Sequence, residues 1–574
     1  MPRSQRAARF VVNVLLVKEK AQPMARKQQS KGCRGSSRRG FLQTVLFGGA
    51  STVLLPALAG AGVQDVTGKF VPSVPPFELD ELSISDLQAA MTAGKYTASS
   101  LAELYLGRIA QIDQKGVILK SVIEVNPDAI SIALDLDRER KQKGPRGPLH
   151  GIPILVKDNI DTGDKMQTTA GSLALAGRPV AKDAHVVQKL REAGAVILGK
   201  TNLSEWANIR SNHSSSGWSG RGGQTKNPYA LDRNPCGSSS GSGAATAANL
   251  CAVAVGTETD GSVICPSSVN GLVGIKPTLG LVSRSGIIPI AHSQDTAGPM
   301  ARSVKDAAIL LSAMAGTDPS DKATADAASK LSPDYTKFLD PNGLRGARLG
   351  IARKYFGSND AVDRVINKMI DAMKQLGAVI IDPADLPSHG KFDDTEFTVL
   401  LYELKNDLNA YLAARPGTPV KTLEEIIAFN ERNRDREMPY FGQDVFIRAQ
   451  AKGPLTDKEY LDALEANHRL SRTEGIDAVM DKFNLDAIVA PSGSPAWLTD
   501  LISGDHGGGE SSNAAAVAGY PNITVPAGLV FGLPIGISFF GRAWSEPKLL
   551  KIAYGFEQAI KARRPPQFLA SAQT

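Results

Sequence analysis

The sequence predicts an α/β protein with one large mixed, mostly parallel β-sheet that helices cover on both faces. Short and fully apolar runs such as 152–156 recur along the chain, as in strands that are buried on both sides. Segments with helical spacing of apolar residues, or rich in alanine, separate these runs, and this alternation is typical of parallel sheets. With 574 residues, the chain can bury an ample core without help from disulfides or metals.

The first part of this fold is predicted to be helical. Apolar side chains lie near helical spacing at Leu87, Met91, Leu101, Leu104 and Leu106. A further helix can begin at Asn126-Pro127-Asp128 and run to about Lys141, because Gly144-Pro145 then ends it.

Strands and helices then alternate. The expected strands are 152–156, 195–198, 251–255, 347–351, 378–381, 487–490 and 535–540. The helices expected between the first three strands are 183–193 and 241–250. Residues 317–475 are more polar and poor in glycine, with amphipathic runs such as 423–427. We therefore expect a helical insertion or cap within one domain, 77–574.

Residues 1–61 are expected to be a twin-arginine-type leader, followed by a linker over 62–76. The segment 37–43 matches the twin-arginine pattern, a moderately apolar run follows over 44–58, and small residues suited to cleavage come next. This order predicts export to the periplasm or beyond, with only transient contact with the membrane. The alternative is a basic N-terminus with a chance arginine pair, which would leave the protein in the cytoplasm. Met24 is a possible start residue.

The charge distribution argues against a nucleic-acid partner. Residues 1–39 hold 11 basic residues and one acidic residue, whereas the remainder holds 54 basic and 57 acidic residues. The basic character therefore belongs to the leader, and the body lacks the footprint that nucleic acids require.

The cysteines show no metal-binding spacing. Of the four, Cys33 lies in the leader, so Cys236, Cys251 and Cys265 remain, and an odd number cannot all pair. At least one is expected to be a buried free thiol, and which of them pair stays open. We expect neither a metal nor a cofactor.

The glycine- and serine-rich run 237–243 is the most informative feature. It precedes the alanine-rich helix, and such a run can turn sharply and direct backbone N–H groups inward. A flexible linker is one alternative, but linkers are not normally followed at once by an apolar helix and strand. A phosphate-binding loop is another, but the GxxxxGK[ST] pattern is absent.

Ser262 follows the strand 251–255 on a glycine-containing loop, where its hydroxyl can be presented and N–H groups from Thr259 onward can meet an oxyanion. A serine nucleophile needs a base. None of the seven histidines has a recognisable triad context. Lys157, at the end of the apolar run 152–156, is the other candidate, because burial lowers the pKa of a lysine. The alternative for Lys157 is a surface lysine whose stem alone is covered.

With these residues, the chain closely resembles the amidase-signature family. The resemblance includes 271–278, 280–284 and 295–300, is dense over about 150–310, and extends more weakly over about 70–570. It implies that Ser262 is the acyl-accepting nucleophile, Ser238 a bridging serine after a cis peptide bond, and Lys157 the neutral base. It further implies that Thr259, Asp260 and Gly261, with Ser262, form the oxyanion loop.

Departures from the family pattern indicate which subgroup of the family this chain resembles. Ile264 stands where relatives often carry arginine, and 258–262 reads Glu-Thr-Asp-Gly-Ser. Together with 221–224 and 227–229, these features are similar to bacterial peptide amidases and unlike the tRNA-dependent amidotransferases. The resemblance implies hydrolysis of the C-terminal amide of peptides, and an aryl- or alkyl-acylamidase is the alternative. A non-catalytic binding protein on the same fold is disfavoured, because Lys157, Ser238 and Ser262 are all present.

Ile264 also leads to an expectation about substrate charge. An apolar side chain cannot pair with a substrate carboxylate, so neutral amides should be preferred over acids such as glutamine or malonamate. A pocket rich in aliphatic side chains should tolerate large apolar groups beside the amide.

Overall fold

The computed structural model describes residues 63–64, 70–71 and 74–573. The predicted leader, and most of the predicted linker, lie outside these residues. β1 (Val63–Gln64) and β2 (Phe70–Val71) pair with each other. No helix among the described residues has the length and hydropathy needed to cross a membrane.

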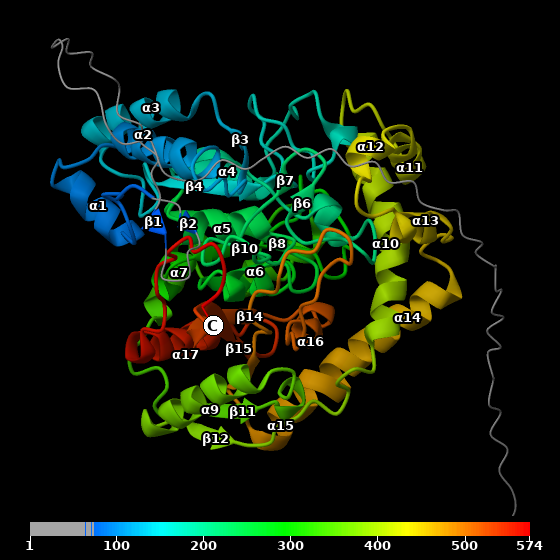
Figure 1. Cartoon of the computed structure of the whole chain (residues 1–574). Coiled ribbons are helices and arrows are strands. Elements are labelled where there is room, and N and C mark those ends of the chain that lie inside the picture. The colour runs from blue at the N-terminus through cyan, green and yellow to red at the C-terminus, as the bar shows by residue number, and fades with distance from the viewer. Residues whose placement is uncertain (1–62, 65–69, 72–73, 574) are drawn as a thin grey trace, which may run out of the picture. The chain divides into compact units, whose positions relative to one another are not determined.

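The described chain is organised around one eleven-stranded sheet, in the order β12-β11-β13-β15-β14-β9-β10-β8-β4-β5-β3 (Figure 1). Its strands are β3 (Val122–Val125), β4 (Pro153–Lys157), β5 (Val196–Thr201), β8 (Val253–Glu258), β9 (Val273–Lys276), β10 (Thr296–Ala301), β11 (Arg348–Ile351), β12 (Val379–Ile381), β13 (Ala487–Pro491), β14 (Asn522–Val530) and β15 (Leu533–Phe540). The predicted single large mixed sheet is confirmed, and all seven expected strands are present. A separate small pair joins β6 (Trp218–Ser219) and β7 (Gly223–Gln224).

Parallel pairing occurs in two blocks, β5-β4-β8 and β12-β11-β13. Antiparallel pairs join these blocks through β10, β9, β14 and β15, and β3 adds antiparallel to β5. Four strands were not expected: β3, β9, β10 and β14. Gly298 and Pro299 in β10, and Pro526 at a bulge in β14, are poor strand formers. Pairing with distant neighbours overrides this local preference, so the antiparallel share of the sheet is larger than the apolar runs suggested.

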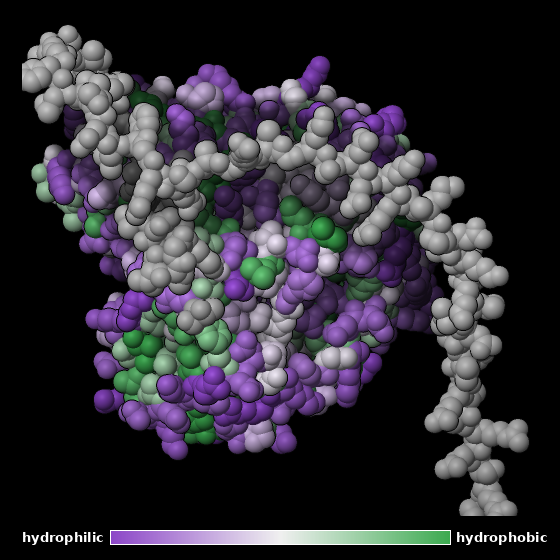
Figure 2. All heavy atoms as spheres, viewed as in Figure 1, coloured by the Kyte–Doolittle hydropathy of each residue, from purple (hydrophilic) through white to green (hydrophobic). Residues whose placement is uncertain are grey.

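Helices cover both faces of the sheet. On one face of the sheet, Met300 of β10 lies against Gly243 of α5. Ala297 and Ala301 point to the opposite face of the same strand, and they belong to the buried cluster that includes α7. Hydrophilic side chains predominate over α14 on the face seen in Figure 2, and an apolar area lies over α17. The helices are α1 (Ile84–Thr92), α2 (Ala98–Arg108), α3 (Ala129–Lys143), α4 (His185–Glu192), α5 (Ser240–Ala247), α6 (Ile264–Val269), α7 (Val304–Met314), α8 (Ala327–Lys330), α9 (Asp360–Gln375), α10 (Asp393–Ala414), α11 (Leu423–Arg432), α12 (Arg434–Glu437), α13 (Asp444–Gln450), α14 (Lys458–His468), α15 (Asp477–Phe483), α16 (Asn513–Val517) and α17 (Glu546–Ile560).

The segment 317–475, expected to be a helical insertion, has two parts. The first part, which ends at β12, belongs to the main sheet, because β11 pairs with both β12 and β13. The continuous helical part is α10 to α14 (Figure 1). Its Leu408, Ile426 and Phe446 belong to a buried cluster that also includes Ala174, Trp206 and Ile288. The helical layer is therefore shorter than the composition of 317–475 suggested.

Candidate active site

Lys157 is the last residue of β4 and is fully buried. Its Nζ lies 2.8 Å from Ser238 Oγ, 3.0 Å from Ser239 Oγ and 2.9 Å from Thr257 Oγ1. Burial lowers the pKa of Lys157 to about 7, although the nearby carboxylates of Asp295 and Glu258 act in the opposite direction. A large fraction of Lys157 is therefore neutral at neutral pH, and a neutral amine beside a hydroxyl can accept its proton.

Ser238 lies on the glycine- and serine-rich run immediately before α5, and the peptide bond Gly237–Ser238 is cis. The run approaches its neighbours closely at Gly237, where a Cβ atom would lie 2.1 Å from Ser204 Oγ. Only glycine fits there, so the residue type at 237 is explained by packing against the Ser204 loop.

Ser262 lies on the loop between β8 and α6 and retains 8% of its surface exposed. The backbone N–H of Ser239 donates to the carbonyl of Ser262 at 3.2 Å, which joins the two serine-bearing loops. No hydrogen bond links the hydroxyls of Ser238 and Ser262 within the described part of the chain. The structure thus places the Lys157 amine in hydrogen-bond contact with the Ser238 hydroxyl, whereas Ser262 is joined to the backbone of Ser239, the residue after Ser238.

The loop 259–261 is held from both sides. Thr259 Oγ1 donates to Asp295 at 2.6 Å, and the Asp260 carboxylate accepts from Ser512 Oγ at 2.7 Å. Gly261 has a positive φ of 73°, which favours glycine. The N–H groups of residues 260–262 find no acceptor among the described residues. They are therefore available to an oxyanion formed on Ser262.

Ile264 does not occupy the place expected of it. Its side chain is fully buried and does not line the cavity at Ser262, and its N–H donates to Glu258 Oε2 at 3.0 Å. The expectation that Ile264 lies beside the substrate is therefore wrong, because every residue of α6 is buried. Any selection for substrate charge must come from other residues.

The cavity at Ser262 has a volume of about 260 Å³ and is mostly polar. Among its lining residues are the acidic side chains of Asp260, Asp505 and Glu510, and none is Lys, Arg or His. The expectation of an aliphatic pocket therefore does not hold at Ser262 itself, although Ile287, Ile288 and Ile290 line the neighbouring cavity beyond Thr257. No motif indicated the acidic lining at Ser262 in advance, because Asp505 and Glu510 lie on a glycine-rich loop more than 240 residues after Ser262.

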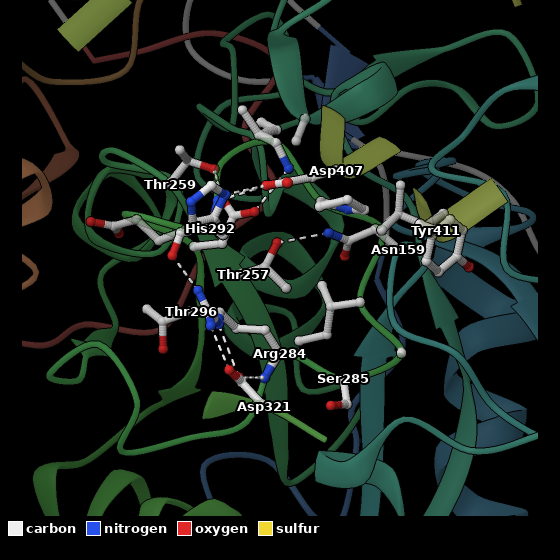
Figure 3. Close-up of a pocket in the computed structure, with 18 of the residues that line it drawn as sticks. Asn159, Thr257, Thr259, Arg284, Ser285, His292, Thr296, Asp321, Asp407 and Tyr411 are labelled. Atoms are coloured by element: carbon white, nitrogen blue, oxygen red, sulfur yellow. Dashed lines mark hydrogen bonds and ion pairs between the residues drawn. The ribbon is translucent and has the colours of Figure 1, made fainter. Parts of the chain in front are cut away.

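A second cavity, of about 370 Å³, lies beyond Thr257 and Thr259 (Figure 3). Asn159 Nδ2 donates to Thr257 Oγ1 at 2.9 Å, so the amide fixes the hydroxyl that in turn contacts Lys157. The charged groups drawn there are largely paired, Arg284 with Asp321 and His292 with Asp407. Asn159 and Thr257 are site residues that the sequence analysis missed, since only the pairing of β4 with β8 brings Thr257 to Nζ and to Asn159.

Two groups of side chains in the described chain are close enough to share a metal ion. One is Cys236, Cys265 and Glu510, but its two cysteines form a disulfide. The other is His292, Glu403 and Asp407, in which the imidazole lies between the two carboxylates. Cys251 is a buried free thiol, so the expectation that at least one cysteine stays free is confirmed.

Several proteins to which this chain is similar are named as amidases or as an amidotransferase. The family model described as Amidase matches residues 100–550. The chain is 45% identical to a probable amidase of Arabidopsis thaliana, over 86% of this chain and 93% of that protein. It is 33% identical to a glutamyl-tRNA(Gln) amidotransferase chain of Thermoanaerobacter pseudethanolicus, over 86% of this chain and 100% of that one. Among solved structures, it matches the native peptide amidase from Stenotrophomonas maltophilia at 52% identity and a TM-score of 0.82, over 86% of this chain and 100% of that one.

Proposed function

The chain belongs to the amidase family, and we propose that it hydrolyses the C-terminal carboxamide of peptides through Ser262, Ser238 and Lys157. The observation that carries this proposal is the fully buried Lys157 amine, 2.8 Å from Ser238 Oγ, beside a loop that presents Ser262 to a cavity. None of the seven histidines lines that cavity, all of them being among the described residues. Lys157 is thus the base that the geometry offers.

In the proposed first half-reaction, Ser262 Oγ attacks the amide carbon. Its proton passes to Ser238 Oγ, whose own proton passes to the neutral Nζ of Lys157. The oxyanion that forms accepts hydrogen bonds from the free N–H groups of 260–262. The C–N bond then breaks as the proton returns through Ser238 to the leaving nitrogen, which departs as ammonia and leaves an ester on Ser262.

In the second half-reaction, water takes the place of ammonia. Lys157 removes a proton from this water through Ser238, the water oxygen attacks the ester carbon, and Ser262 leaves with the returning proton. The products are a carboxylic acid and the free enzyme, so one water is consumed for each amide cleaved.

The peptide-amide assignment draws on two observations. The chain is similar to peptide amidases, one of them solved with the competitive inhibitor chymostatin at 51% identity and a TM-score of 0.83, over 85% of this chain and 100% of that one. The acidic side chains of Asp505 and Glu510 in the cavity, with no cation in its lining, favour neutral amides over substrates that carry a carboxylate near the amide. This preference is strongest above about pH 7, because burial raises the pKa of Glu510 to about 7. The acidic lining, and not Ile264, therefore supports the expected preference for neutral amides.

The test is ammonia release from a panel of substrates at matched pH. We expect kcat/KM for an N-acylated peptide amide to exceed that for glutamine by at least about 100-fold, a ratio typical of discrimination by one unpaired buried charge. Anilides and fatty amides in the panel test the acylamidase alternative. A preference for glutamine, or for anilides, would overturn the peptide-amide assignment.

We further propose that the enzyme works after export, by means of the leader 1–61 with its arginine pair at 38–39. A functional leader would separate it from aminoacyl-tRNA, the substrate context of the related amidotransferases.

A further inference from the structure

The disulfide Cys236–Cys265 joins the two loops that carry the two catalytic serines of the proposed mechanism. Cys236 lies two residues before Ser238, and Cys265 lies three residues after Ser262. The two Cα atoms are 6.0 Å apart although 29 residues separate them in the sequence. Both cysteines are nearly buried, with 4% and 5% of their surface exposed. The disulfide therefore links the backbone two residues before Ser238 to the backbone three residues after Ser262.

Other contacts between these loops are few. The backbone bond from Ser239 to Ser262 joins them directly, and Asn270 Nδ2 donates to the carbonyl of Pro235 at 3.0 Å just beyond α6. Lys157 contacts Ser238 and Ser239 but has no hydrogen bond to Ser262. The position of Ser262 relative to Ser238 thus depends on the disulfide, on packing, on these two hydrogen bonds, and on the two bonds between Ser239 Oγ and the backbone of Thr257, five residues before Ser262.

We infer that the Cys236–Cys265 disulfide is a positioning element of the active site, which holds the Ser262 hydroxyl within proton-transfer reach of Ser238. This inference rests on the proposed function. Proton transfer needs the two oxygens at hydrogen-bond distance, and a displacement of about 1 Å can lower a rate about 100-fold. Seven of the twelve residues that line the cavity at Ser262 come from other segments, although Cys236 itself is part of the lining. Loss of the link therefore lowers kcat more than it changes KM.

Acidic groups surround the link. A carboxylate oxygen of Glu510 lies within 4.8 Å of the ligand atoms of both cysteines, and Asp260 and Asp505 line the same cavity. Burial raises the pKa of Glu510 to about 7 and also raises the pKa values of Asp260 and Asp505, so the negative charge around the link increases with pH. Thiol–disulfide exchange proceeds through an attacking thiolate, which these groups repel when they are ionised. The surroundings therefore suit a permanent link better than a rapidly reversible switch.

The experiment compares Cys236→Ser, Cys265→Ser and the double variant with the wild type and with Cys251→Ala. Cys251→Ala is the matched control, because it removes a buried cysteine but keeps the disulfide. Circular dichroism and thermal unfolding establish that each protein is folded at the assay temperature. The readouts are kcat and KM for a peptide amide, and the rate of inactivation by a serine-directed fluorophosphonate.

We expect kcat and the fluorophosphonate rate to fall together by about 10- to 100-fold in all three disulfide variants. KM should stay within about threefold, the double variant should equal the single variants because they break one link, and Cys251→Ala should keep wild-type kcat. If the folded variants keep kcat within twofold, the disulfide has only a stabilising role and the inference fails, whatever happens to the melting temperature.

Should the variants fail to fold, the wild type is reduced in its folded state with dithiothreitol and its free thiols are counted. Activity should fall as two thiols appear and return on reoxidation, whereas full activity with both thiols exposed would overturn the inference. The proposed function is tested separately: it fails if the wild type releases no ammonia from any amide, or if Ser262→Ala is fully active. The positioning role fails alone if Ser262→Ala is inactive while the disulfide variants are not impaired.

Discussion

Replacing Lys157 by methionine should abolish activity and yet stabilise the protein at neutral pH. Burial lowers the pKa of Lys157 from 10.5 to about 7. This fall corresponds to about 5 kcal/mol by which folding is disfavoured at or below pH 7, since the unfolded chain holds the proton more tightly. Methionine has a similar length and no charge, so it removes this penalty.

The pH dependence gives the sharper signature. Between about pH 7 and 10.5, the unfolded wild type binds a proton at Lys157 that the folded protein does not, so wild-type stability rises by about 1.4 kcal/mol per pH unit. Lys157→Met lacks this contribution. The electrostatic part of its advantage over the wild type is therefore largest at pH 7 and below, falls steadily above pH 7 and vanishes near pH 10.5.

Lost hydrogen bonds reduce the gain. Without Nζ, the Ser238 and Thr257 oxygens lose a buried partner, which costs on the order of 1–3 kcal/mol. We therefore expect Lys157→Met to be about 2–4 kcal/mol more stable than the wild type at pH 7, measured from urea unfolding at pH 7, 8, 9 and 10. Ser262→Ala is the control, because it should lose activity but keep the pH slope of the wild type. A stability difference that does not change over this pH range would refute the assignment of Lys157 as a neutral buried base.

Three further predictions concern the chemistry and the leader. Ser262→Ala should lower ammonia release by about 10³-fold or more with the fold intact, and Ser238→Ala should be milder because water can relay the proton; wild-type rates in Ser262→Ala would contradict the mechanism. Asp295→Asn removes a negative charge that raises the pKa of Lys157, so the rise of kcat/KM with pH should move to lower pH, and a move to higher pH would contradict the electrostatic argument. Replacing both arginines of the pair at 38–39 by lysine should leave the enzyme active but block export, as measured by fractionation of the host cells, and unchanged export would exclude a twin-arginine leader.

Apolar runs and glycine-rich motifs predicted the parts of this fold that depend on neighbours in the sequence. The apolar run before Lys157 identified β4, and the glycine- and serine-rich run located Ser238 before α5. β10 and β14 were missed, because their glycine and proline residues are acceptable only where both neighbouring strands are in place. The helical layer was placed too broadly, since composition cannot tell that β11 and β12 return to the sheet.

The candidate site likewise has a part that local sequence predicted and a part that only the fold brings together. The groups proposed to carry the chemistry stand in motifs, whereas the groups that surround them come from distant segments. Counting cysteines left their pairing open, and only the fold brings Cys236 to Cys265. Asp505 and Glu510 reach the cavity from a loop with no recognisable motif, so the acidic lining could not be predicted.

The energetics of Lys157 connect the size of the fold to its proposed chemistry. A penalty of about 5 kcal/mol is comparable to the whole net stability of many proteins, which is about 5–15 kcal/mol. Lys157 lies fully buried at the end of a strand between β8 and β5, and within the described part of the chain its amine has Ser238, Ser239 and Thr257 as hydrogen-bond partners. An exposed lysine would cost nothing but would stay protonated at neutral pH and could not accept a proton. The large buried sheet therefore has a direct chemical role, because it makes a neutral lysine at this position compatible with a folded protein.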